Sequence, residues 1–259
     1  MRQIFNSVSF LSYKLPVTTA ESLSSFLLTS ILNEKEIALH FSASHGFVEA
    51  AKNEHLENVF KSDMIVSDGF PLSRYLRIKD KKFLQIRGTD FMRIALRNST
   101  TEISHFFLGS SEVNLNTLIL KIKNDNPLVN IAGYYSPKFG LDWRTEIHNW
   151  NSLILNSNAN VVWVGMGAPK QFLISSSLKN SLKISTVSVG AAFDFLPGTK
   201  AESPVFFQKI GLEWFYRLLM EPRRLFKRYL VGNFYFVRLV AIDFCLIFLA
   251  NLFKSGKRN

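Results

Sequence analysis

Short apolar runs alternate with helix-like stretches along most of the chain. Residues 20–32 carry apolar side chains at helical spacing, and the apolar run 37–41 that follows has the length of a buried strand. Later strand-like runs are also short and apolar, and most lead directly into a glycine; they are 64–66, 106–108, 129–132, 161–164 and 186–189. The stretches between them, for instance 47–60, 111–123 and 143–156, are long enough to be helices. This alternation predicts a Rossmann-like, three-layer α/β domain with a mostly parallel sheet.

The pattern changes near Pro197. Residues 203–253 are basic, aromatic and helical in their spacing, without further strand-like runs. We therefore expect an α/β core over residues 1–197 and a helical appendage over residues 198–259.

The end of this appendage is strongly apolar. Residues 239–253 read LVAIDFCLIFLANLF, but Asp243 interrupts the run and Arg238 precedes it. Because a membrane-spanning helix needs about 20 apolar residues, the pattern favours a helix that lies on a membrane, with a buried terminal helix or a dimer interface as alternatives. The cations expected to meet anionic headgroups are Arg217, Arg223, Arg224, Lys227, Arg228, Arg238, Lys254, Lys257 and Arg258.

Composition narrows the class of protein. With 47% hydrophobic and 20% charged residues, the 259-residue chain can bury a core, which excludes a disordered protein. The single cysteine, Cys245, allows neither an internal disulfide nor a thiolate metal cluster, so a packing role and a reducing compartment fit. The first residues, MRQIFNSVSFLSYKLP, lack the features of a signal peptide.

Charge is concentrated at the end of the chain. The net charge is +11, and residues 200–259 hold 11 basic and 4 acidic side chains, which leaves +7 there. Such a segment predicts an anionic partner: a phosphate-bearing ligand, a membrane surface or nucleic acid. The apolar residues interleaved with the charges favour lipid over nucleic acid.

Glycines after several strands suggest where a ligand binds. Open parallel sheets bind ligands beyond the carboxyl ends of their strands, where backbone N–H groups can approach phosphate. A nucleotide-type ligand is therefore expected. The chain contains neither GxGxxG nor GxxxxGK[ST], so dinucleotide and P-loop sites lose their support and no cofactor is expected.

Two charged residues stand out in the first half of the chain, Asp68 after the strand-like run 64–66 and Arg87 after residues 83–86. Asp68 precedes Gly69 and has two interpretations of equal weight: a general base for a sugar hydroxyl, or a cap of a helix over residues 70–76. Arg87 opens the sequence RGTD and can bind a diphosphate bidentately or pair with Asp90.

Two later segments repeat the strand-then-glycine arrangement. The first, VVWVGMGAPKQ at 161–171, delivers Lys170, suited to phosphate or carboxylate, and Gln171, suited to sugar hydroxyls; a surface turn is the alternative. The second, VSVGAAFDFLPG at 187–198, places Asp194 where it orients a ligand or caps a turn.

Further along, the sequence EPRRLFKRY supplies a cluster of cations. Arg223, Arg224 and Arg228 fall within two helical turns, and the spacing of four places Arg224 and Arg228 on one face. A diphosphate and lipid headgroups are both suitable partners.

Missing motifs exclude other chemistries. The five histidines form no HExxH pair, and neither a DxD sequence for a nucleotide-bound cation nor a GxSxG elbow is present. A reaction that needs no metal is therefore preferred.

Taken in order, several segments resemble the WecG/TagA/CpsF glycosyltransferases, glycosyltransferase family 26. They are FSASHGFVEAAKN, VSDGFPLSR, RGTDF, FFLGSS, VVWVGMGAPKQ, VSVGAAFDFLPG and GLEWFYRLLMEPRRLFKRY. The likeness runs from about residue 20 to 229. The ordered set is specific, above all its GLEW to RRY-like ending.

The resemblance implies an inverting, metal-independent bacterial enzyme at the cytoplasmic face of the inner membrane. It would transfer a sugar from a nucleotide-diphosphate donor, such as UDP-N-acetylmannosamine, its uronic acid or UDP-glucose, to a polyprenyl-diphosphate-linked saccharide of a surface polysaccharide. Asp68 would match the general base. Substrate contacts would come from Ser42, Arg87, Lys170, Gln171, Asp194, Arg223, Arg224 and Arg228, the three last completing the site on the membrane.

Some positions depart from the family pattern. Ser42-Ala43-Ser44 stands where relatives have a TxN-like turn, Phe172 replaces a glutamate after PKQ, and residues 201–204 read AESP instead of a basic KRAP-like stretch. These changes motivate an alternative: a non-catalytic subunit that binds nucleotide sugar or lipid diphosphate. A homo-oligomer stays open as a further form of the protein.

Overall fold

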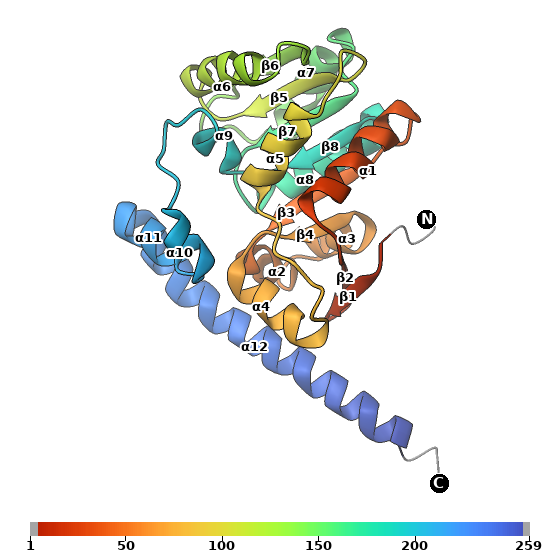
Figure 1. The fold of residues 1–259 in the computed structure, drawn as a ribbon, viewed down its shortest axis with the longest axis vertical. Helices are drawn as coiled ribbons and strands as arrows, with labels where there is room; N and C mark the ends of the chain where they lie inside the picture. The colour runs from red at the N-terminus through yellow and green to blue at the C-terminus, as the bar shows by residue number, and fades with distance from the viewer. Residues whose placement is uncertain (1–4, 256–259) are drawn as a thin grey trace.

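The computed structural model describes residues 5–255 (Figure 1). A two-stranded antiparallel hairpin precedes a six-stranded parallel sheet with the strand order β4-β3-β8-β7-β5-β6. The strands are β1 Ser7–Phe10, β2 Tyr13–Pro16, β3 Ala38–Ser42, β4 Met64–Ser67, β5 Ser104–Gly109, β6 Asn130–Tyr135, β7 Val161–Gly165 and β8 Ser185–Ser188. The helices are α1 Ala20–Leu32, α2 Ser44–Ala50, α3 Glu54–Ser62, α4 Phe70–Lys79, α5 Gly88–Arg97, α6 Glu112–Asp125, α7 Trp143–Asn156, α8 Lys170–Leu182, α9 Ala192–Phe195, α10 Val205–Lys209, α11 Glu213–Met220 and α12 Pro222–Ser255.

Helices cover both faces of the parallel sheet, which confirms the α/β class. Helices α1, α5, α6 and α9 pack together on one face, and α1 and α5 lie in front of the sheet in Figure 1. Helices α3, α7 and α8 form the other layer.

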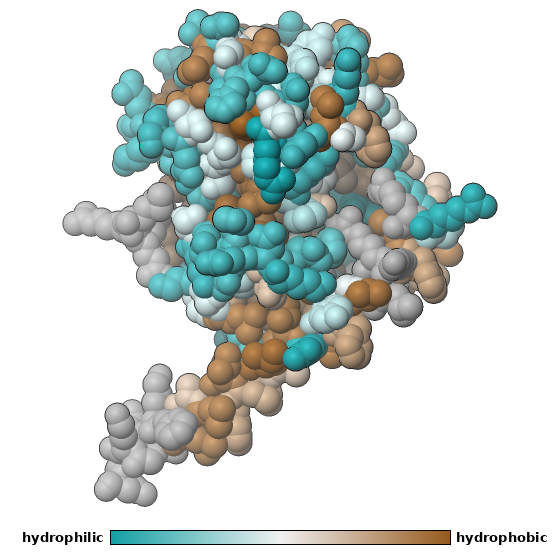
Figure 2. All heavy atoms as spheres, turned by 180° about the vertical axis from the view of Figure 1, so that it is seen from behind, coloured by the Kyte–Doolittle hydropathy of each residue, from teal (hydrophilic) through white to brown (hydrophobic). Residues whose placement is uncertain are grey.

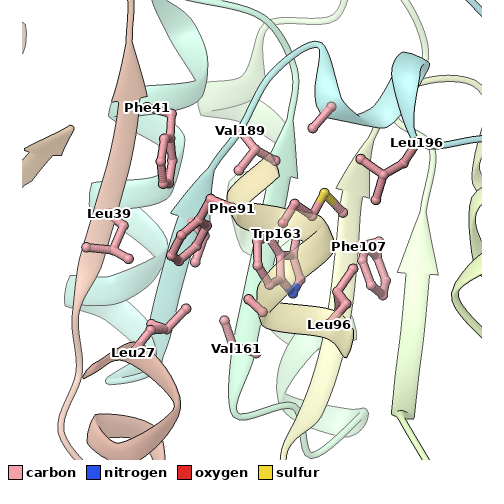
Figure 3. Packing of buried hydrophobic residues seen from close by; sticks show 14 of the residues in the cluster. Leu27, Leu39, Phe41, Phe91, Leu96, Phe107, Val161, Trp163, Val189 and Leu196 are labelled. Carbon is pink, nitrogen blue, oxygen red and sulfur yellow. The ribbon is translucent and has the colours of Figure 1, made fainter. Parts of the chain in front are cut away.

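The central strands alternate their side chains between the two layers. On β7, Val161 and Trp163 face the α1–α5 layer, whereas Val162 and Val164 face α7 and α8. Figure 3 shows Trp163 among the side chains of the first layer, including Phe91. Burying one such side chain contributes about 1.5–3 kcal/mol, so this core holds the carboxyl ends of the strands in a fixed arrangement.

Two details of the predicted elements are wrong. The stretch 47–60 is not one helix, because Asn53 accepts a hydrogen bond from the Leu56 amide (3.0 Å) and starts a new helix, α3. Gly133 does not end its strand but lies inside β6, where a Cβ atom would come within 3.0 Å of the Phe106 ring on β5. The glycine there makes room for a neighbouring side chain.

The chain after the core is helical, as the sequence predicts. Helices α10 and α11 lead into α12, which runs along α2 and the end of the molecule that carries α4 and the β1–β2 hairpin (Figure 1). Residues Val231–Leu252 of α12 are long and apolar enough to cross a membrane. The domain boundary at residue 197 and the contact with a membrane stay predictions.

Candidate functional site

Asp68 lies directly after β4, at the carboxyl edge of the sheet. Its backbone amide donates to the Ser42 carbonyl at the end of β3 (3.1 Å), which continues the pairing of the two strands. The segment before α5 runs beside this point, because the Ile86 amide donates to the Ser67 carbonyl (3.1 Å) and the Gln85 side chain to the Asp68 carbonyl (2.6 Å). Asp68 and Arg87 are thus held at one place by backbone pairing.

The Asp68 carboxylate accepts a hydrogen bond from the Gly88 amide (3.0 Å), the first residue of α5. It does not cap α4, since Gly69 is the N-cap residue of that helix and no side chain caps it. The predicted capping interpretation is therefore wrong for α4, and the carboxylate meets the N-terminus of α5 instead.

The pKa of the Asp68 carboxyl is raised to about 6. The main cause is burial, which disfavours the charged form, and the nearby carboxylate of Glu213 adds to it; Arg217, the Gly88 amide and Arg87 act in the opposite direction. A carboxyl with this pKa is largely ionised at neutral pH and is a better proton acceptor than an ordinary aspartate.

Arg87 is largely buried, with its side chain 12% exposed, and lies among carboxylates. Its guanidinium contacts Asp90 (3.3 Å), as the sequence alternative predicts, and also Glu202 (3.3 Å) and Glu213 (3.3 Å). Gln208 accepts a further hydrogen bond from it (3.0 Å). Burial lowers the pKa of Arg87, but Glu213, Asp90, Glu202 and Asp68 together outweigh this and raise the pKa above its ordinary value.

Helix α11 brings two residues to this place that the sequence interpretation missed. Glu213 bridges Arg87 and Arg217, its contact with the Arg217 guanidinium being 2.8 Å. The Arg217 guanidinium also lies 4.7 Å from the Phe195 ring, and its charge acts on Asp68. The Nε atom of Arg217 is buried and has no hydrogen-bond partner among the described residues.

The sequence partly indicates the ion pair between Glu213 and Arg217. Glu213 and Arg217 are four residues apart and share a helix face, but the sequence assigned Arg217 to the membrane-facing cations. No local pattern places α11 next to β4, which lies about 150 residues earlier in the chain.

Gln171 and Ser42 are buried at the same edge of the sheet. The Gln171 side chain lies beside Gly190, whose φ of +54° is favoured by glycine, and its Oε1 atom is buried without a partner among the described residues. Few buried side-chain oxygens in proteins lack a donor, so this one can accept a hydrogen bond from a ligand. Ser42 donates to the Ala43 carbonyl (3.1 Å) and packs directly against Gly46.

Lys170 and Asp194 lie in α8 and α9, the helices that follow β7 and β8. Lys170 is partly exposed at the first turn of α8, which begins after a cis Ala168-Pro169 bond. Asp194 pairs with Lys200 (3.0 Å) and accepts a hydrogen bond from Asn114 (3.1 Å). These contacts fit a structural role for Asp194, and its contact with a ligand stays a prediction.

The structure gives less information on the predicted site arginines of α12. Arg223 is exposed in the first turn of the helix. The side chains of Arg224 and Arg228 lie outside the described part of the structure, so their expected role stays a prediction. The guanidiniums that the described residues bring to Asp68 are those of Arg87 and Arg217.

Across residues 5–255, no group of three or more His, Cys, Asp or Glu side chains is arranged to hold a metal ion. Two of the histidines, His40 and His105, lie in the core. His40 bridges Asp63 (3.1 Å) and Ser188 (3.1 Å), and burial lowers the pKa of His105 to about 3.

The chain is similar to known proteins over most of its length. The model of the glycosyl transferase WecG/TagA/CpsF family matches residues 8–246. A protein of Bacillus spizizenii, called N-acetylglucosaminyldiphosphoundecaprenol N-acetyl-beta-D-mannosaminyltransferase, is 31% identical over 206 residues, which cover 77% of this chain and 78% of that protein. A protein of the same name from Bacillus subtilis is 26% identical over 181 residues, covering 69% of each chain. The chain therefore belongs to the WecG/TagA/CpsF family of glycosyltransferases.

Proposed function

We propose that this glycosyltransferase moves N-acetylmannosamine from a nucleotide-diphosphate donor, such as UDP-N-acetylmannosamine, to a polyprenyl-diphosphate-linked N-acetylglucosamine. The names of the two Bacillus relatives describe the transfer of N-acetylmannosamine to N-acetylglucosaminyldiphosphoundecaprenol. The observation that carries the proposal is the Asp68 carboxylate, which has its pKa raised to about 6 and is close enough to Arg87 and Arg217 to interact with their charges.

Asp68 is the general base in this proposal. It accepts the proton of the acceptor hydroxyl while the hydroxyl oxygen forms a bond to the anomeric carbon of the donor. The bond from that carbon to the diphosphate oxygen breaks at the same time, so the configuration is inverted. The reaction releases the nucleotide diphosphate.

Arg87 and Arg217 stabilise the negative charge that develops on the leaving diphosphate. Guanidinium groups bind phosphate oxygens bidentately, and their charge takes the place of a metal ion in this mechanism. Both arginines are paired with Glu213, and Arg87 also with Glu202, before a ligand binds. The donor diphosphate would exchange places with these carboxylates.

The other predicted residues serve substrate binding. Gln171 has a buried Oε1 atom without a partner among the described residues, which suits a sugar hydroxyl or an N-acetyl N–H group. Ser42 and Lys170 lie at the same edge of the sheet. Arg223, Arg224 and Arg228 at the start of α12 would reach the acceptor diphosphate.

A lipid-linked acceptor places the enzyme at a membrane. We propose peripheral attachment at the cytoplasmic face of the bacterial inner membrane. The apolar surface of α12 and the excess of seven positive charges over residues 200–259 support this proposal.

The function is tested with the purified full chain and a synthetic N-acetylglucosaminyl diphosphate carrying a short polyprenyl chain. UDP-N-acetylmannosamine, its uronic acid and UDP-glucose are supplied separately, with and without EDTA, and product mass and anomeric configuration are recorded. We expect a β-linked N-acetylmannosamine product that forms equally well in EDTA. Nucleotide-sugar binding without turnover would favour the non-catalytic alternative, and a loss of activity in EDTA would exclude the metal-independent mechanism.

A further inference from the structure

Asp243 lies near the middle of the apolar segment Val231–Leu252 of α12. A carboxylate at this position is unusual for a helix that crosses a membrane, because it would lie close to the centre of the hydrocarbon. The contacts of Asp243 in the structure therefore indicate which arrangement α12 adopts in a membrane.

The Asp243 side chain enters a site built by the body of the protein. Its residue is only 4% exposed. Oδ1 accepts a hydrogen bond from the Leu11 amide in the turn of the β1–β2 hairpin (2.7 Å), and Oδ2 accepts one from the Tyr75 hydroxyl of α4 (2.6 Å). Lys79 of α4 also contacts Oδ2 and donates to the Ser9 carbonyl (2.7 Å).

Apolar residues extend this contact along one face of α12. Leu225 and Phe236 are buried, and Leu239 and Val240 pack on the same cluster as Phe236. Phe236 and the three other residues Leu239, Val240 and Asp243 follow the spacing of three and four that places side chains on one helix face, and Leu225 lies about three turns earlier on that face. Asp243 thus belongs to the face of α12 that is docked on the protein.

The opposite face of α12 is apolar and exposed. Its large side chains include Phe234 (72% exposed), Val237 (65%), Phe244 (63%) and Phe248 (57%). Figure 2 shows this hydrophobic surface continuing along the helix beyond the body of the protein. A soluble protein rarely exposes such a continuous apolar strip, so the strip indicates an interaction surface.

Two arrangements in a membrane are open to a helix of this length. If α12 crossed the bilayer, Asp243 would leave Leu11, Tyr75 and Lys79 and enter the hydrocarbon without partners. If α12 lay along the membrane surface, Asp243 would keep its partners and the exposed face would enter the lipid. The arrangement along the surface therefore satisfies both faces of the helix.

We propose that α12 is an in-plane membrane helix whose outer face enters one leaflet of an anionic bilayer, and that the Asp243 site holds it there and prevents it from crossing. The proposal rests on the proposed function in one respect, the presence of a membrane-bound acceptor. The positive charge of residues 200–259 fits anionic headgroups, and Arg238 is exposed on this helix.

The single cysteine of the chain provides a probe at the right place. Cys245 is exposed and lies two residues after Asp243. In the full-length protein it is labelled with an environment-sensitive fluorophore and mixed with vesicles of phosphatidylcholine and phosphatidylglycerol. Nitroxide groups placed near the lipid glycerol or near the acyl-chain ends then report the depth of the label.

We expect the label on the otherwise unchanged protein to be quenched several-fold more by nitroxides near the glycerol than by those near the chain ends. Asp243→Leu removes the carboxylate, so its label should move toward the bilayer centre and the variant should resist alkaline extraction. Asp125→Asn, at the exposed end of α6, is the matched control and should behave as the unchanged protein.

Stronger quenching from the chain ends in the unchanged protein would show a spanning helix and overturn the proposal. A label that stays unquenched by either nitroxide, in a protein that sediments as a dimer, would show that a second copy covers the strip instead. Transfer to a short-chain, water-soluble acceptor is measured on the same samples, so failure of the catalytic proposal is seen separately.

Discussion

Asp68 and Asp243 both carry carboxylates inside the protein, but the hydrogen-bond donors around the two carboxylates differ. The Asp68 carboxylate receives one hydrogen bond from the described residues, from the Gly88 amide, and its pKa is raised to about 6. Asp243 receives hydrogen bonds on both oxygens from Leu11, Tyr75 and Lys79.

The number of donors separates a reactive carboxylate from a structural one. A carboxylate with few donors and a raised pKa retains a lone pair and an affinity for protons, as a general base requires. One whose oxygens are both occupied by donors from the hairpin and α4 connects distant parts of the chain. We therefore expect substitutions at the two positions to affect different properties of the protein.

The largest expected effect is on the rate of transfer. Asp68→Asn should lower kcat by roughly a hundredfold to ten-thousandfold, because the acceptor hydroxyl loses its proton acceptor. Asp243→Asn should change kcat by less than about fivefold with a short-chain, soluble acceptor, since it lies outside the site. Initial rates of both variants measure the difference, and Asp68→Asn with full activity would remove Asp68 from the proposed role.

The second effect is on stability, and here it is the substitution at Asp243 that is expected to destabilise the protein. Asp243→Ala should lower the free energy of unfolding by about 2–4 kcal/mol, because Lys79 and Tyr75 lose their acceptor in a buried place. Burial raises the pKa of Tyr75, as does its bond to Asp243, so the tyrosine depends on this partner.

Asp68→Asn should instead raise the free energy of unfolding at pH 7 by about 1–3 kcal/mol. A pKa raised in the folded state means that folding favours the protonated form, so stability falls as pH rises from about 4 to about 6. The asparagine side chain of the variant carries no charge, so the variant avoids this loss of stability. Urea unfolding of both variants in the same mild detergent measures the changes, and equal destabilisation of the two would contradict the distinction.

The smallest effect concerns the carboxylates around Arg87. Glu202 contacts both Arg87 (3.3 Å) and Arg93 (2.9 Å). In the proposed mechanism the donor diphosphate displaces Glu202 from Arg87. Glu202→Gln should therefore lower the KM for the donor by about two- to fivefold, the range expected for one partly exposed ion pair.

Glu102→Gln, in an exposed turn, is the matched control for this change of charge. Steady-state kinetics with the donor as the varied substrate measure both variants. A rise in KM would show that Glu202 positions Arg87 rather than competing with the donor.

The parallel sheet and its strand ends were predictable because they depend on local patterns. Alternating apolar runs and helices imply parallel strands, and the carboxyl ends of such strands meet at one edge. This reasoning placed Asp68 and Gln171 at one edge of the sheet, but not Arg87, which follows residues 83–86, a segment that forms no strand. It could not give the contacts of Arg87 with Glu202 and Glu213, which lie more than a hundred positions away.

The roles of Arg217 and Asp243 were not predictable for the same reason. Each depends on how the C-terminal helices dock, and docking depends on long-range packing rather than on spacing along the chain. Asp243 appeared only as an interruption of an apolar run, whereas its partner Leu11 lies 232 residues earlier. A charge inside an apolar helix indicates a partner but not which one.

The dependence of kcat/KM on pH tests whether Asp68 accepts the proton of the acceptor. With a short-chain acceptor, the rate of the unchanged enzyme should be level above about pH 6 and fall tenfold per pH unit below it, because the carboxyl becomes protonated. Asp68→Asn should be slow at every pH and lack this inflection. A rate that stays level from pH 7 to pH 5 in the unchanged enzyme, or the same inflection in Asp68→Asn, would contradict the account.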